Sequence, residues 1–293
     1  MKFERATKTQ SRLRMALIGP SGSGKTYSAL SIAKHLGSRI AVIDTERGSA
    51  SKYADEFEFD CLELATFAPQ NFIEAIQAAD AAGYDVLVID SLSHAWIGKG
   101  GSLEQHDKEV DKQKVKNSFT AWREVTKNHS ALIDAILQSR CHVIGTMRSK
   151  TAHVQEEENG RKVVRKIGME AIQRDGMEYE FDVVGDLDWS HKLTISKTRC
   201  RKLDGEVIEK PGREIAEVLK RWLSDGAADT TEQERADVLS QLHEIFTSQG
   251  KTNDEWVDYA AKSLKALSLP ALRERLAEWM KAAEQRKEKT AHA

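Results

Sequence analysis

Gly19-Pro-Ser-Gly-Ser-Gly-Lys-Thr26 is the stretch that decides the fold, because it fits the pattern G-x-x-x-x-G-K-[ST]. An apolar run, Met15–Ile18, precedes it, and a segment of helical character, Tyr27–Leu36, follows it. In such a strand, loop and helix, the glycines let backbone N–H groups surround phosphate oxygens, and the helix N-terminus adds its positive dipole end. The stretch therefore predicts a binding site for a nucleoside triphosphate, with a Gly-rich turn that holds no ligand as the alternative.

Two residues of this stretch have specific expected roles. Lys25 is expected to contact the β- and γ-phosphates, and Thr26 to ligate Mg²⁺. The expected cofactors are therefore ATP and Mg²⁺. The residues expected to contact the nucleotide are Gly19, Pro20, Ser21, Gly22, Ser23, Gly24, Lys25, Thr26 and Tyr27.

The composition limits the class of protein. A chain of 293 residues is long enough for one large α/β domain and a smaller one. Its net charge of -2 gives no overall attraction for nucleic acid, so any such contact must come from local patches. The three cysteines show no C-x-x-C spacing, which favours reduced thiols in the cytoplasm. No signal peptide and no apolar span of membrane length are recognised, so we expect a cytoplasmic protein without membrane contact.

Apolar strands alternate with helical segments along most of the chain. The expected strands are Leu13–Ile18, Arg39–Asp44, Asp60–Leu64, Asp85–Asp90, Cys141–Met147, Tyr179–Leu187 and Lys192–Lys197. The expected helices are Lys25–Leu36, Asn71–Ala82, Phe119–Gln138 and Glu214–Leu223. This alternation predicts an α/β fold with a mostly parallel central sheet and helices on both faces, and with the last two strands antiparallel at an edge. The pattern changes after residue 223, so we expect an ATPase core over 1–227 and a small α-helical domain with a polar tail over 228–293.

Two carboxylates that follow buried strands are candidates for catalysis. Asp90 ends an apolar strand as a Walker B aspartate does, and is expected to hold Mg²⁺ with Thr26. Glu46, in Asp44-Thr-Glu46, is the candidate base that orients the attacking water. The alternatives are a carboxylate that caps a strand end and an ordinary turn carboxylate.

Later strands supply four more candidates. Thr146 and Arg148 end the strand after Asp90 and are possible sensors of the γ-phosphate, although Arg148 could instead face solvent. Lys197 and Arg199 are two residues apart on a strand, so both would lie on one face and could reach the γ-phosphate of a neighbouring subunit. The alternative for this pair is a solvated basic edge that prevents sheet aggregation.

Two segments expected to be loops, 97–117 and 148–170, are the candidates for contact with single-stranded DNA. Both carry several Lys or Arg residues, which suit phosphate contacts on mobile loops. Both also carry acidic residues, so solvated loops of mixed charge are the alternative. Neither segment contains Phe, Tyr or Trp for base stacking, which argues against tight binding.

Taken in order, these motifs resemble the core of RecA/RadA-type ATPases. The resemblance rests on Gly19–Thr26, Asp44-x-Glu46, Val86–Ser91 and Lys197-x-Arg199. More closely, residues 10–223 are similar to bacteriophage RecA-like nucleotide-binding proteins, a group that includes core-only recombinases that assist single-strand annealing. The resemblance implies a RecA-like P-loop ATPase that self-associates with active sites at subunit interfaces. It also implies action on single-stranded DNA in phage recombination or repair, with DNA held by the segments that match 97–117 and 148–170.

The chain departs from RecA at three places. RecA has a Gln where this chain offers Thr146 or Arg148, residues 1–11 lack its polymerisation segment, and the C-terminal helices match no family that we name. Two other functions therefore stay open. One is an ATP-dependent switch or loader that binds a phage or host recombination or replication protein through those helices. The other is a small-molecule kinase with residues 148–170 as its lid.

Overall fold

The chain divides into two compact units, Arg12–Leu223 and Ser224–Ala293, with the residues up to Ser11 grouped with the second. The computed structural model describes Arg5 and residues 7–113, 117–158, 161–226, 230–264, 267 and 269–291. The expected boundary between residues 227 and 228 stays a prediction, since residues 227–229 lie outside the described part.

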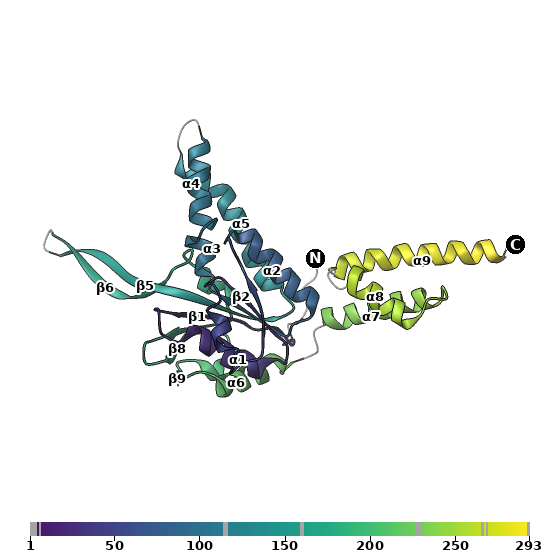
Figure 1. Ribbon diagram of the computed structural model, residues 1–293, viewed down its shortest axis with the longest axis horizontal. Coiled ribbons are helices and arrows are strands. Elements are labelled where there is room, and N and C mark those ends of the chain that lie inside the picture. Colours follow the sequence, from purple (N-terminus) through teal and green to yellow (C-terminus); the bar gives the residue numbers. More distant parts are fainter. Residues whose placement is uncertain are drawn as a thin grey trace. The chain divides into compact units, whose positions relative to one another are not determined.

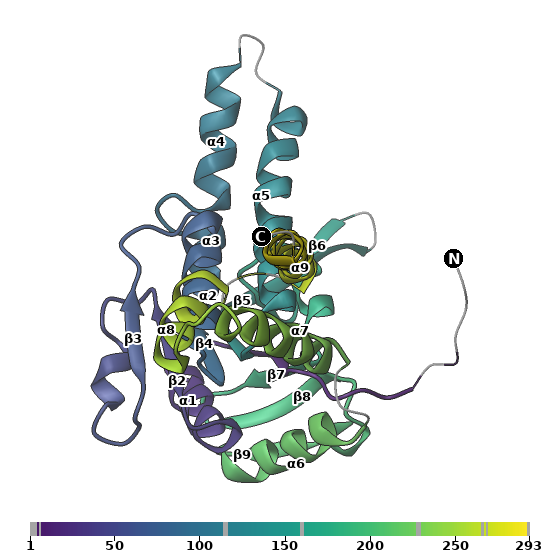
Figure 2. The ribbon, with the colours of Figure 1, turned by 90° about the vertical axis from the view of Figure 1, so that its right-hand side faces the viewer.

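A sheet of nine strands, counted over the described residues, forms the centre of the first unit (Figures 1 and 2). The strand order is β3-β2-β4-β5-β1-β7-β8-β9, and β6 pairs with β5 alone. The bounds are β1 Arg14–Gly19, β2 Ile40–Asp44, β3 Asp60–Glu63, β4 Val86–Asp90, β5 His142–Glu158, β6 Arg161–Ala171, β7 Val183–Leu187, β8 Lys192–Thr198 and β9 Val207–Glu209. All pairs from β3 to β7 along this order are parallel, and β5–β6, β7–β8 and β8–β9 are antiparallel. The predicted mostly parallel sheet is confirmed.

Helices cover both faces of the sheet, as predicted. The bounds are α1 Lys25–Leu36, α2 Pro69–Ala82, α3 Ser93–Ile97, α4 Ser102–Lys112, α5 Ser118–Gln138 and α6 Arg213–Ser224. Along β1, side chains alternate between the two faces. Met15 and Leu17 share a hydrophobic cluster with α1 and α6, whereas Ala16 and Ile18 share one with α2 and α5. Figure 2 shows α1 and α6 on one side of the strands and α2 and α5 on the other.

The two segments expected to be loops are largely regular structure. In 97–117, α4 occupies Ser102–Lys112, and Glu104 and Lys108 form an ion pair one helical turn apart. The segment 148–170 is almost entirely a hairpin of β5 and β6, paired from Ser149↔Ala171 to Glu158↔Arg161. Figure 1 shows this hairpin extending away from the sheet. Residues 114–116 and 159–160 of these segments lie outside the described part.

The late strands also differ from expectation. Tyr179 belongs to a short 3₁₀ turn, Met177–Glu180, and β7 begins only at Val183. The β7–β8 pair is antiparallel as predicted, but β7 is parallel to β1 inside the sheet. The short strand β9 forms the edge instead, and its three residues are too few to give a sequence signal.

The second unit is helical within the described residues. It contains α7 Thr230–Thr247, α8 Asn253–Tyr259, a π-helical turn Ala260–Leu264 and α9 Leu269–Ala291. Its core is formed by Val238, Leu242, Leu264, Leu272 and Leu276. No helix in the described part of the chain has the length and apolar character needed to span a membrane.

Candidate nucleotide-binding site

The loop between β1 and α1 has the backbone geometry that its glycines permit. Gly22 and Gly24 have φ angles of 79° and 84°, a left-handed conformation that other residues rarely adopt. At Gly24 there is also no room for a side chain, because a Cβ would lie 2.9 Å from Nδ1 of His191. Ser28 N–H donates to the Gly24 carbonyl at 2.9 Å, which closes the first turn of α1. The loop thus leads directly into a helix N-terminus, the setting that favours a bound phosphate.

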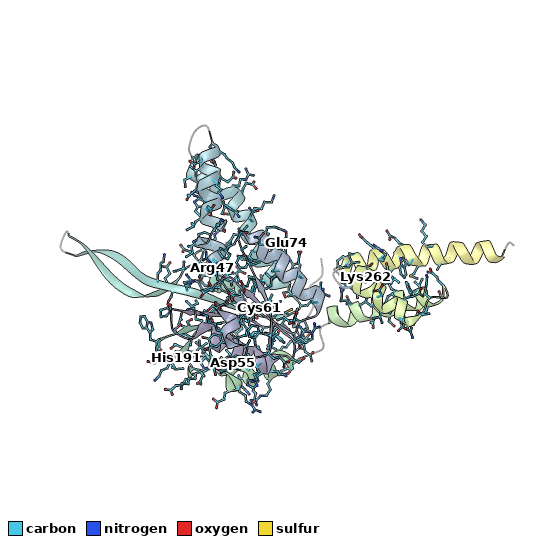
Figure 3. All side chains as sticks on the ribbon, viewed as in Figure 1. Arg47, Asp55, Cys61, Glu74, His191 and Lys262 are labelled. Carbon is cyan, nitrogen blue, oxygen red and sulfur yellow. The ribbon has the colours of Figure 1, made fainter. Side chains whose placement is uncertain are left out.

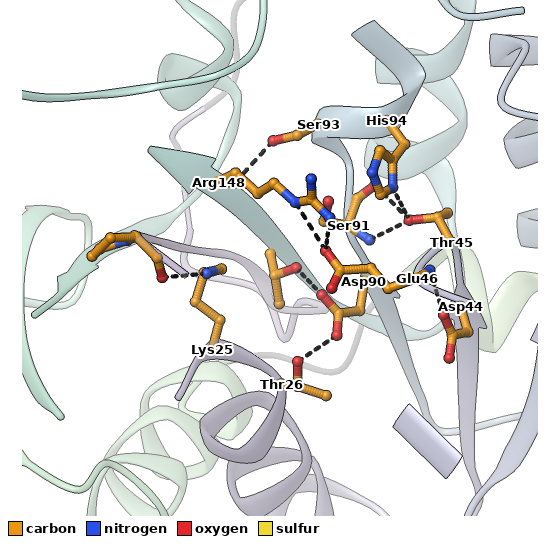
Figure 4. Close-up of polar contacts among 12 residues, drawn as sticks. Lys25, Thr26, Asp44, Thr45, Glu46, Asp90, Ser91, Ser93, His94 and Arg148 are labelled. Carbon is orange, nitrogen blue, oxygen red and sulfur yellow. Dashed lines mark hydrogen bonds and ion pairs between the residues drawn. The ribbon is translucent and has the colours of Figure 1, made fainter. Parts of the chain in front are cut away.

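Asp90 is held by two hydroxyl groups at the carboxyl ends of the parallel strands (Figure 4). Thr26 Oγ1 donates to Asp90 Oδ2 at 2.6 Å, and Thr146 Oγ1 donates to Asp90 Oδ1 at 2.5 Å. Burial raises the pKa of the Asp90 carboxyl above its ordinary value, and the two hydroxyl donors oppose that effect. Asp90, at the end of β4, therefore connects Thr146 on β5 to Thr26, which follows the Gly-rich loop.

The oxygen atoms of Thr26 and Asp90 are a donor set that suits Mg²⁺. This ion is commonly bound through one or two protein oxygens together with phosphates and water, so a larger group of protein ligands is not required. Within the described residues, no group of three or more His, Cys, Asp or Glu side chains could hold a metal ion. Thr26 and Asp90 are thus the residues that fit the expected magnesium.

Lys25 lies over the loop that precedes it. Its Nζ donates to the Pro20 carbonyl oxygen at 2.8 Å. Burial lowers the pKa of the Lys25 ammonium, while the charges of Asp90 and Glu46 act in the opposite direction. A phosphate oxygen that replaced the Pro20 carbonyl would give this ammonium a stronger, charged acceptor.

Glu46, the candidate base, and Arg148, a candidate γ-phosphate sensor, form an ion pair. Glu46 Oε1 accepts from Arg148 Nε at 3.0 Å and from Arg148 Nη2 at 2.7 Å. The Asp44 carboxylate accepts instead from the backbone N–H groups of Glu46 and Ala50, so it shapes the turn after β2. Arg148 is the last residue of β5 that pairs with β1, opposite Gly19, and it directly precedes Ser149, where the pairing of β5 with β6 begins. The ion pair thus connects the candidate base to the hairpin.

A second contact network, which sequence reasoning missed, joins the ends of β2 and β4. Thr45 Oγ1 accepts from Ser91 N–H at 2.7 Å and lies 2.6 Å from His94 Nδ1. The His94 ring stacks on Phe67 with a centroid distance of 4.9 Å. Burial lowers the pKa of His94, so the neutral ring is favoured beside Arg148. No sequence motif connects these residues, and only the pairing of β2 with β4 brings them together.

Lys197 and Arg199 lie at the amino-terminal ends of the parallel strands, whereas Asp90 lies at their carboxyl ends. Thr198 pairs with Val183, the first residue of β7, whereas Asp90 is the last residue of β4. Lys197 Nζ donates to the carbonyl oxygens of Glu178, Tyr179 and Phe181 at 3.1, 2.6 and 2.5 Å. Arg199 pairs with Asp182 at 2.9 Å, and its side chain is 61% exposed. The structure therefore does not bring either cation to the site of its own chain.

Tyr27, in the first turn of α1, contacts residues of the segment that lies between β2 and β3. Its hydroxyl donates to Glu56 Oε2 at 3.0 Å, and its ring makes edge-to-face contacts with Tyr53 and Phe57. Its expected contact with the nucleotide stays a prediction.

The parallel sheet, the Gly-rich loop that begins α1 and the aspartate that joins Thr26 to the end of β4 define a P-loop NTPase. A family model described as an AAA domain matches residues 11–213, more than half of the chain. The chain belongs to this AAA-domain family, which points to nucleotide binding and hydrolysis. A search of curated proteins finds no match to the chain.

Proposed function

We propose that this protein is a Mg²⁺-dependent ATPase of RecA-like type whose hydrolysis is raised by single-stranded DNA. The observation that carries the ATPase is the position of Asp90, which accepts hydrogen bonds from Thr26 and Thr146 at the carboxyl end of β4. Two buried or half-buried hydroxyls and a carboxylate converge there beside the N-terminus of α1.

Each residue of the site has a defined task in this proposal. Backbone N–H groups of the Gly19–Gly24 loop and the Lys25 ammonium bind the phosphates. Thr26 and Asp90 hold Mg²⁺, which when bound neutralises charge on the phosphate oxygens. Glu46 accepts a hydrogen bond from the attacking water and so orients it. In the structure the Arg148 guanidinium is hydrogen-bonded to the Glu46 carboxylate. Hydrolysis in this proposal therefore requires that Arg148 leave the carboxylate, or that the carboxylate bind Arg148 and the water together.

The proposed DNA contact involves the β5–β6 hairpin. Its second strand carries Arg161, Lys162, Arg165 and Lys166 in sequence, and such cations suit a phosphate backbone. The hairpin pairing begins at Ser149, the residue after Arg148, and Arg148 contacts Glu46. Single-stranded DNA bound at the hairpin would therefore affect Arg148, the residue that is paired with the candidate base Glu46.

The proposal is tested by measuring ATP hydrolysis of the full chain with and without single-stranded DNA at increasing salt. We expect DNA to raise the rate, and the affinity for DNA to fall steeply with salt because phosphate contacts release counterions. No salt-sensitive DNA binding in the presence of ATP would reject the DNA part and leave the ATPase intact.

Self-association and a role in phage recombination complete the proposal. Arg199 is exposed at the end of the strands opposite the nucleotide-binding site of its own chain, which supports a contact with a neighbouring subunit's nucleotide. Lys197 is less suited to that role, because its ammonium already binds three backbone carbonyls.

A switch or loader is the second candidate function. Val257 on α8 is 65% exposed and Met280 on α9 is 49% exposed, so the helical unit presents apolar side chains that a partner protein could cover.

A further inference from the structure

We propose that Trp189, in the turn between β7 and β8, is the surface on which the base of the bound nucleotide stacks. This inference rests on the proposed nucleotide binding and adds the part of the site that recognises the nucleoside. The ligand class is a nucleotide with an aromatic base, as distinct from a bare polyphosphate.

The β7–β8 turn is held in one conformation by its own hydrogen bonds. Asp188 Oδ1 accepts from the backbone N–H groups of Ser190 at 2.8 Å and Lys192 at 3.0 Å. His191 N–H donates to the Asp188 carbonyl at 3.1 Å, and His191 has a φ angle of 60°. Trp189 is therefore carried by a tight turn with a fixed backbone.

This turn lies directly against the phosphate-binding loop. Trp189 Nε1 donates to the Ser21 carbonyl at 3.3 Å, and His191 Nδ1 donates to the Ser23 carbonyl at 3.1 Å. The ring of His191 also faces Gly24, whose missing side chain allows the approach. Figure 3 labels His191 at the margin of the unit that holds this loop.

The indole of Trp189 is anchored at one edge and open elsewhere. Its nitrogen is hydrogen-bonded to the loop, yet the residue is 69% exposed. Among the described residues, no ring contact is found for Trp189. Large aromatic side chains are usually well buried, so an exposed indole fixed beside a nucleotide loop is a feature that calls for a ligand.

The sheet order places Trp189 on the nucleoside side of the loop. Thr146 on β5, Asp90 on β4 and Glu46 after β2 all lie on one side of β1. The terminal phosphate must lie near these groups for hydrolysis. The nucleoside end then extends toward the other side of β1, where β7 is the neighbouring strand. Tyr27 is the other exposed aromatic beside the loop, but its ring and hydroxyl are already engaged by Tyr53, Phe57 and Glu56.

The test compares the affinities of the full chain for ATP and for inorganic tripolyphosphate, both with Mg²⁺. Trp189→Ala should weaken ATP binding about 10-fold, because base–aromatic stacking has that magnitude, and should leave tripolyphosphate binding nearly unchanged. Trp189→Phe keeps a ring but loses the N–H donor, so it should retain most of the affinity for ATP. Phe119→Ala, which removes an aromatic side chain that is 86% exposed on α5, is the matched control and should alter neither affinity.

Two results would overturn the inference while the ATPase proposal stands. One is a wild-type chain that binds tripolyphosphate as tightly as ATP. The other is a Trp189→Ala variant that weakens both ligands equally, which would mean that the indole only supports the loop. If Tyr27→Ala weakened the binding of ATP alone and Trp189→Ala did not, the base would stack on Tyr27 and not on Trp189. A wild-type chain that binds neither ligand would reject the nucleotide site as a whole.

Discussion

At the scale of single residues, Asp90 combines a stability cost with the proposed role in binding Mg²⁺. Burial raises the pKa of its carboxyl in the folded state above the unfolded value. Such a group contributes stability below the unfolded pKa, and this contribution is lost as pH rises through the folded pKa. The ligand-free protein therefore bears the cost of a buried carboxylate at neutral pH, and the proposed Mg²⁺ site requires that same charge.

Replacing Asp90 by Asn should expose this trade-off. We expect Asp90→Asn to increase the free energy of unfolding at pH 8, because a neutral amide avoids the cost of burying the Asp90 charge. The gain should shrink toward acidic pH, where the wild-type carboxyl is protonated. Urea unfolding without nucleotide at several pH values measures it, and Thr26→Ser, which keeps the hydroxyl donor, is the control. An Asn variant that is less stable than wild type at pH 8 contradicts this reading.

Arg148 restrains Glu46, so its removal should change hydrolysis in a specific direction. The pair is partly exposed, with side chains that are 41% and 27% accessible, and such pairs contribute at most about 1 kcal/mol. We expect Arg148→Ala to raise basal ATP hydrolysis by up to about fivefold and to remove the response to DNA. Steady-state rates with and without DNA measure both effects.

Two controls make the Arg148 result interpretable. Arg213→Ala breaks an exposed ion pair with Glu217 on α6 and should leave the rates unchanged. Glu46→Gln should abolish hydrolysis in both the wild-type and Arg148→Ala backgrounds. A basal rate that falls in Arg148→Ala would instead favour direct contact of Arg148 with the γ-phosphate.

The sequence supports proposals for residues whose chemistry has a fixed local spacing. Lys25, Thr26 and Asp90 are recognisable because a phosphate loop and a strand-end aspartate have local patterns. The contacts that Glu46 and Asp90 make with distant parts of the chain could not be predicted from such patterns. Arg148 is 102 residues from Glu46, and Thr146 is 56 residues from Asp90. Only the insertion of β5 between β1 and β4 brings them together.

At the scale of elements, the β5–β6 hairpin is the part of the first unit that depends least on the rest. Beyond Ser149 its strands pair only with each other in the described residues, so the parallel sheet does not need them. Replacing residues 151–169 by a two-residue Asn-Gly turn should leave basal ATP hydrolysis within about twofold, as for other surface changes. Stimulation by DNA should be lost.

Hydrolysis and DNA-binding assays on the shortened protein decide this prediction. Substituting Glu156, Glu157 and Glu158 by Gln keeps the hairpin and serves as the control, in which the response to DNA should persist. Full stimulation by DNA in the shortened protein would place the DNA contact elsewhere.

Elements with strong periodicity were predicted, and those without it were missed. Helices α1 and α5 and strands β2 and β4 follow from apolar patterns, because both faces of the sheet are buried. Helix α4 lacks an apolar stripe and buries only Ser102, so its sequence reads as a polar loop. The sequence carries Asn159-Gly160, a dipeptide typical of tight hairpin turns, which could have indicated two paired strands on either side of it.

At the scale of the whole molecule, the two units have separate hydrophobic cores. If the first unit is the DNA-stimulated ATPase, a chain ending at Leu223 should still hydrolyse ATP and still respond to DNA. If the protein is instead a loader, this truncation should remove partner binding. Circular dichroism and thermal unfolding establish that the shortened chain is folded before its rates are compared. Loss of ATP hydrolysis in a folded truncated chain would show that the helical unit takes part in the site.

The most direct measurement is a calorimetric titration of ATP into the full chain with and without Mg²⁺, for wild type and for Lys25→Ala. We expect wild type to bind ATP with an affinity that depends on Mg²⁺, and the variant to lose most of that affinity because a charged phosphate contact is gone. Equal affinities of the two proteins for ATP would contradict the assignment of Gly19–Thr26 as the phosphate-binding loop.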